Sequence, residues 1–189
     1  MVKEAAPVDS EPVRAAPGAG LADLSPAYFG LVMATGIVSL SAQMLGHRSL
    51  ASALFQLNVV QYAALWLLYG LRAWRHPRRF FGDMVAHLTG PGYFTAVAGT
   101  GILASEFLVL RENLVAGTAL WMLTIVLWLC LTYPIFTALT IRRDKPALDR
   151  GISGSWLLAV VATQAVSVSS SLIAARIGQP FRLELNLLA

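Results

Sequence analysis

The stretch from Pro26 to Ile37 reads PAYFGLVMATGI, and the chain repeats it from Pro91 to Ile102 as PGYFTAVAGTGI. The shared pattern P-x-Y-F-x-x-V-x-x-T-G-I has no gap, and its copies lie 65 residues apart. A weaker third copy follows Gly154, with Trp156 in the tyrosine place and Thr163 seven residues later. Repetition at a fixed period identifies the structural unit of a fold. Because each copy begins an apolar segment, the unit is predicted to be a membrane helix together with the segment that returns the chain to the same side of the membrane.

Composition supports a membrane protein. Hydrophobic residues make up 57% of the 189 residues, charged residues 13%, and the mean hydropathy is +0.65. Soluble domains carry roughly 25% charged residues, so this chain cannot cover itself with polar surface in water. The single cysteine, Cys130, lies in an apolar run and offers no disulfide or thiolate site. No metal site, cofactor or catalytic constellation is predicted, and we do not expect an enzyme.

The apolar segments predict an all-α integral membrane protein with five transmembrane helices. Each segment has the roughly 20 residues that a helix needs to cross the hydrocarbon core. We expect tandem parallel hairpins, with residues 1–24 as a disordered cytoplasmic tail and residues 25–189 as the transmembrane domain. The predicted units are a hairpin over 26–74, a hairpin over 91–141, a helix over 152–175 and the start of a sixth span at 183–189.

Basic residues predict the orientation. Eight of them follow the second and fourth segments, whereas the other two connections carry only Arg48 and Arg111. Since cytoplasmic loops are enriched in lysine and arginine, the rich loops and the N-terminus are predicted to be cytoplasmic. The residues that we expect to form a basic cytoplasmic mouth are Arg72, Arg75, Arg78, Arg79, Arg142 and Arg143.

The first, third and fifth segments carry stripes of small and hydroxyl residues, whereas the second and fourth are bulkier and more apolar. Polar stripes belong inside a membrane bundle, so the odd segments are predicted to be inner helices. A neutral hydroxyl lining with a basic mouth favours anions over cations. The candidate path residues are Thr35, Gly36, Ser39, Thr100, Gly101, Thr163, Gln164 and Ser167.

Helix packing is the alternative explanation of the same stripes, because small residues let membrane helices approach closely. A non-transporting interaction subunit or an inactive truncated fragment would then fit the sequence. Glu106 is the one acidic residue within a predicted span. We expect it to be an interfacial or paired residue near the outer end of its helix, five residues from Arg111, rather than a coupling site.

Three ordered motifs carry a resemblance to a known family. FGLVMATGIVS at 29–39, GPGYFTAVAGTGI at 90–102 and GISGSWLLAVVATQ at 151–164 resemble the tellurite-resistance/C4-dicarboxylate transporter (TDT) family. That family includes bacterial tellurite-resistance proteins, fungal malate and sulfite carriers, and plant slow anion channels.

The resemblance implies five helical hairpins per protomer and a path for small inorganic anions or C4-dicarboxylates between the odd helices. It also implies a multi-pass protein of the cell membrane, commonly a homo-trimer. Thr35, Gly36, Thr100, Gly101 and Thr163 match the motif positions. At this length the chain is expected to correspond to the N-terminal half of such a protein, without the family's gating phenylalanine.

Overall fold

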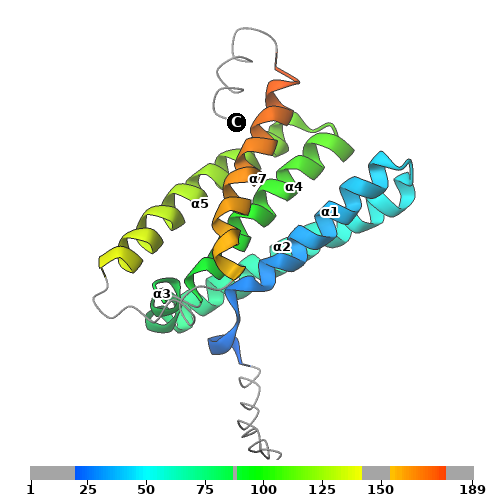
Figure 1. The fold of residues 1–189 in the computed structure, drawn as a ribbon. Coiled ribbons are helices and arrows are strands. Elements are labelled where there is room, and N and C mark those ends of the chain that lie inside the picture. The colour runs from blue at the N-terminus through cyan, green and yellow to red at the C-terminus, as the bar shows by residue number, and fades with distance from the viewer. Residues whose placement is uncertain (1–19, 87–88, 142–153, 178–189) are drawn as a thin grey trace, which may run out of the picture.

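Five long helices form the body of the protein (Figure 1), which is described for residues 20–86, 89–141 and 154–177 of a computed structural model. They are α1 (Gly30–Met44), α2 (Arg48–Arg75), α4 (Phe94–Leu110), α5 (Leu114–Ile141) and α7 (Leu157–Ala174). All five, with their short N-terminal extensions, are long and apolar enough to cross a membrane. The prediction of an all-α membrane protein with five spans is therefore confirmed.

The sequence repeat is also a structural repeat. A 3-10 turn precedes the first, third and fifth spans: η2 (Pro26–Phe29) before α1, η3 (Gly90–Tyr93) before α4, and η4 (Gly154–Trp156) before α7. Proline stands in the first turn of η2 and η3, where its missing N–H costs no hydrogen bond. In Figure 1 the three helices begin at the same end of the bundle. Each unit is thus a short turn followed by a span of the same orientation.

A tight turn joins α1 to α2. Gly46 adopts a positive φ of 84°, which glycine tolerates without steric cost. The N–H of His47 donates to the carbonyl of Ala42 at 2.9 Å, and the N–H of Gly46 donates to that of Gln43 at 3.1 Å. These two bonds form a Schellman motif, which ends a helix and satisfies its last carbonyls. The chain therefore reverses within a few residues and returns as α2.

Helix α4 is the centre of the bundle. In an 18-residue window of its span 78% of the residues are buried, compared with 11% to 33% in the other four spans. It packs against α1, α5 and α7. Its small residues allow this: a Cβ at Gly101 would lie 2.9 Å from the Cβ of Ala165 on α7, and one at Gly99 would lie 3.4 Å from Val32 on α1. Close approach through small residues is the usual basis of membrane helix packing.

Two features at the end of the bundle where the repeated turns lie differ from the expectations. The basic segment after α2, which the sequence predicts as a loop, contains a short helix, α3 (Pro77–Met84). Residues at the end of the expected disordered tail are ordered, because η1 (Leu21–Asp23) is held against α2 and α3. The folded part therefore begins a few residues earlier than expected. Residues 1–19 and the expected start of a sixth span at 183–189 lie outside the described residues.

Candidate functional site

A groove runs along the face that α1, α4 and α7 share. Its volume is about 390 Å³, and most of its lining side chains are apolar, with Ile37 and Leu40 from α1 and Val161 and Val168 from α7 among them. Polar character enters through Ser105 and Gln164. Two of the eight candidate path residues, Gly101 and Gln164, line this groove.

The candidates on α1 lie toward neighbouring helices. Ser39 is buried, and its hydroxyl donates to the carbonyl of Ala51 on α2 at 3.0 Å. Gly36 is buried against α2 and α4. Thr35 is half-buried. On this helix the stripe therefore serves the contacts of α1 with its neighbours.

Thr100 on α4 is fully buried. Its hydroxyl donates to the carbonyl of Ala96 in its own helix at 2.7 Å and lies 3.0 Å from the hydroxyl of Tyr62 on α2. Gly101 lets α7 approach, and its carbonyl accepts from the hydroxyl of Ser169 at 2.9 Å. The Thr-Gly pair of the second motif copy thus joins α4 to helices on two sides.

On α7 the two neighbouring candidates diverge. Thr163 is exposed, and its hydroxyl accepts from the indole N–H of Trp128 on α5 at 3.0 Å. Gln164 is exposed on the groove. Ser167 is half-buried.

Hydroxyls outside the predicted set also join helices. Ser105 and Ser169 lie 3.4 Å apart between α4 and α7, and the indole of Trp121 donates to Ser170 at 2.9 Å. Their four-residue spacing from Gly101 and Val166 indicates a helix face but not which neighbour it meets.

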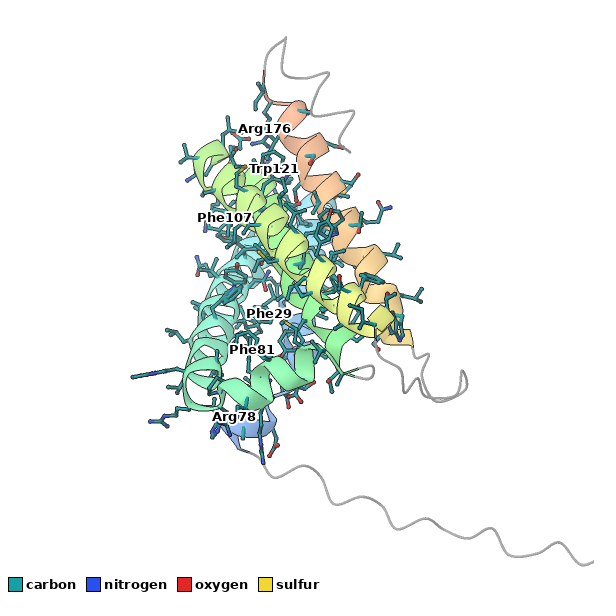
Figure 2. The ribbon with its side chains drawn as sticks, turned by 90° about the vertical axis from the view of Figure 1, so that its left-hand side faces the viewer. Phe29, Arg78, Phe81, Phe107, Trp121 and Arg176 are labelled. Carbon is teal, nitrogen blue, oxygen red and sulfur yellow. The ribbon has the colours of Figure 1, made fainter. Side chains whose placement is uncertain are left out.

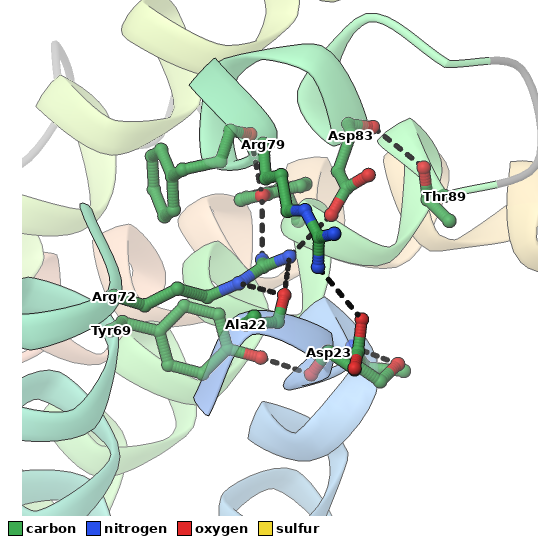
Figure 3. Close-up of polar contacts among 11 residues, drawn as sticks. Ala22, Asp23, Tyr69, Arg72, Arg79, Asp83 and Thr89 are labelled. Atoms are coloured by element: carbon green, nitrogen blue, oxygen red, sulfur yellow. Dashed lines mark hydrogen bonds and ion pairs between the residues drawn. The ribbon is translucent and has the colours of Figure 1, made fainter. Parts of the chain in front are cut away.

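The predicted basic mouth is partly neutralised (Figure 3). Arg72 is 1% exposed, and its guanidinium pairs with Asp83 of α3 and donates to the carbonyl of Ala22 at 3.0 Å. Arg79 lies 3.5 Å from Asp23. Arg75 and Arg78 are exposed, and Figure 2 shows Arg78 at this end of the molecule. Two of the six predicted arginines, Arg142 and Arg143, lie outside the described residues.

A pocket of about 380 Å³ lies at the other end, between the α1–α2 and α4–α5 turns. Arg48 and Arg111 line it together with Gln43, Ser52 and Glu112. The guanidinium of Arg111 lies 4.9 Å from the ring centre of Phe55, a cation–π contact. Positive side chains therefore stand at both ends of the bundle.

Comparison with known proteins gives one family match. The family model described as voltage-dependent anion channel (SLAC1) matches residues 23–188. Neither the curated proteins nor the solved structures contain a significant match.

Proposed function

Because this chain belongs to the voltage-dependent anion channel family, we propose that it conducts anions along the groove between α1, α4 and α7. The family match confirms the resemblance to the TDT family, whose members are channels and transporters rather than enzymes. The observation that carries the proposal is the alignment of the three repeated helices. They begin at one end and share a groove of about 390 Å³ that contains Gly101 and Gln164.

The lining favours small monovalent anions over C4-dicarboxylates. An anion in this groove meets mainly aliphatic side chains, and the amide of Gln164 is one of its few hydrogen-bond donors. Such a lining offsets little of the cost of removing water from a charge, and a dianion pays that cost more heavily. Weak binding suits conduction, because an ion must leave as readily as it enters. Exposed Arg75 and Arg78 would raise the local anion concentration at the α3 end.

Localisation and assembly follow from the same proposal. The protein would be a multi-pass protein of the cell membrane with its N-terminus in the cytoplasm, as the basic connections indicate. A homo-oligomer, trimeric by family resemblance, would leave the outer helices α2 and α5 of each protomer facing lipid or another subunit.

The packing alternative has its own support. Ser39, Thr100 and Thr163, three of the predicted path hydroxyls, are within hydrogen-bonding distance of groups on neighbouring helices. If these contacts are the only role of the stripes, the chain is a non-transporting interaction subunit or an inactive fragment. The two functions differ in whether a change to the groove alters flux without altering the fold.

Anion efflux from proteoliposomes tests the proposal. Vesicles containing the purified chain are loaded with chloride or with malate and compared with protein-free vesicles. We expect faster chloride efflux and little malate efflux. Gln164→Leu should change chloride flux, because it removes the amide from the groove. Thr163→Val is the matched control, because the hydroxyl of Thr163 lies at α5.

Equal flux in all protein-containing and protein-free vesicles, with the chain inserted and helical, would overturn the proposal and favour the packing alternative. Equal flux of wild type and Gln164→Leu, both above the protein-free rate, would mean that the anion path does not run along this groove.

A further inference from the structure

Glu106 is the one acidic residue within the five spans, and it is fully buried. It lies on α4, the most buried helix of the bundle. The amide nitrogen Nδ2 of Asn58 on α2, itself fully buried, donates to its Oε2 at 2.5 Å. The sequence predicts an interfacial or paired residue at this position, and its partner is the amide of Asn58 rather than Arg111.

Two oxygens in this pair have no hydrogen-bond partner: Oε1 of Glu106 and Oδ1 of Asn58. If Glu106 were ionised, both atoms could only accept, and neither would be satisfied. Buried polar atoms without partners are rare and call for an explanation.

No cation offsets a charge at this position in the described part of the chain. The ion pairs there are Arg72–Asp83 and Arg79–Asp23, both at the α3 end. Helices α1 and α7 contribute no titratable group. On α2, Tyr62 lies against Thr100, and Arg48 lines the pocket at the turns together with Arg111, which follows α4. The other titratable groups of α2 are Tyr69, Arg72 and Arg75, in the part of the helix next to α3. On α5 they are Cys130 and Tyr133, both exposed.

We propose that Glu106 binds a proton and forms a neutral acid–amide pair with Asn58. The carboxylic O–H would then donate to Oδ1 of Asn58, while Nδ2 of Asn58 donates to the other carboxyl oxygen. One proton thus satisfies both orphaned oxygens and removes an uncompensated charge from the centre of a membrane bundle.

The repeated motif provides the space for this pair. A Cβ at Gly36 would lie 2.8 Å from Nδ2 of Asn58 and 3.2 Å from Oε2 of Glu106. Glycine at this position therefore lets α1 close over the pair without displacing it. Release of the proton would place a carboxylate under α1 and between α2 and α4, so the site would couple pH to the packing of these three helices.

Infrared spectroscopy of the purified chain in lipid nanodiscs tests the site at neutral pH, where exposed carboxyl groups are ionised. Wild type should show the C=O stretch of a protonated carboxyl group, shifted to lower frequency in D₂O. Glu106→Gln should lose this band. Glu112→Gln, which alters an exposed carboxyl beyond the end of the same helix, should keep it. A folded wild type without the band would overturn the proposal.

Thermal unfolding gives a second readout. Glu106→Gln preserves two complementary hydrogen bonds with Asn58, so its melting temperature should stay close to that of wild type at neutral pH. Glu106→Ala should melt lower, because it leaves Asn58 unpaired. If Glu106→Gln melted as low as Glu106→Ala, an ionised carboxylate would be required and the proposal would fail. Neither readout depends on anion flux, so the proposed proton site is tested independently of the proposed anion path.

Discussion

The two motif glycines, Gly36 and Gly101, have different neighbours although they occupy the same place in the repeat. A Cβ at Gly36 would lie 2.4 Å from Cγ2 of Ile102, and one at Gly101 would lie 2.9 Å from Ala165. Both positions set how closely two inner helices approach. The repeat therefore preserves a packing distance rather than one particular contact.

Gly36→Ala should destabilise the protein by about 1–3 kcal/mol, the usual cost of overpacking a filled site. The added methyl group would press on Ile102 and on the Asn58–Glu106 pair. Gly70→Ala on α2 is the control, since nothing lies within 4 Å of its added Cβ. Because alanine favours a helix, that control should be neutral or stabilising by up to about 1 kcal/mol. Unfolding in detergent measures both changes, and equal stability of the two variants would contradict the packing role of Gly36.

Ser170→Ala tests a hydrogen bond between helices. The hydroxyl of buried Ser170 accepts from the indole of Trp121 on α5, so its removal should cost roughly 0.6 kcal/mol, the average for such bonds in membranes. Ser171→Ala is the neighbouring control, because the exposed Ser171 donates within its own helix to Ser167 at 3.1 Å. Equilibrium unfolding compares them, and a loss as large in the control would exclude a specific contribution from the α5–α7 bond.

At the scale of elements, the spans could be predicted because length and hydropathy suffice to identify a membrane helix. The rotation of each helix about its axis could not. Thr100 and Thr163 occupy equivalent motif positions, yet one is fully buried near Tyr62 and the other is exposed beside Trp128. Which neighbour a stripe meets depends on packing among helices far apart in the sequence. Helix α3 was missed because its arginines suggested a loop, although Pro77 in its first turn is a helix-start signal.

The buried side chain of Arg72 links helix α3 to η1. Arg72 pairs with Asp83 of α3, donates to the carbonyl of Ala22 in η1, and donates to the hydroxyl of Tyr93 at 3.3 Å. The hydroxyl of Tyr69 donates to the carbonyl of Ser25 next to η1. A planar guanidinium reaches several partners at once, which explains why an arginine, rather than a hydrophobic residue, is buried here.

Arg72→Lys should release η1 while keeping the positive charge. An ammonium group lacks the fork of donors, so we expect a loss of about 1–2 kcal/mol, typical of buried polar groups left unpaired. Hydrogen exchange should rise at Leu21–Asp23 and in α3. Arg75→Lys, at an exposed arginine on the same helix, should leave exchange unchanged. Unchanged protection in Arg72→Lys would mean that other contacts hold the N-terminal segment.

At the scale of the whole molecule, the parallel repeat makes the two ends of the bundle different. The three repeated turns η2, η3 and η4 gather at the α3 end, and the two hairpin turns lie at the other (Figure 1). An arrangement of this kind has no inverted partner within the described residues. The proposed orientation in the membrane therefore rests on the flanking charges, which favour a cytoplasmic α3 end.

Cysteine labelling in intact cells tests this orientation. Cys130 is exposed on α5, so Cys130→Ala provides a background for single cysteines. Arg78→Cys lies at the α3 end and Glu112→Cys at the α4–α5 turn, and both positions are exposed. A membrane-impermeant maleimide should label Glu112→Cys in intact cells and Arg78→Cys only after permeabilisation. The reverse pattern would show that the protein has the opposite orientation, with η1 and the exposed arginines of the α3 end outside the cell. Labelling of both positions in intact cells would mean that the protein does not insert in a single orientation, and the proposed orientation would be wrong.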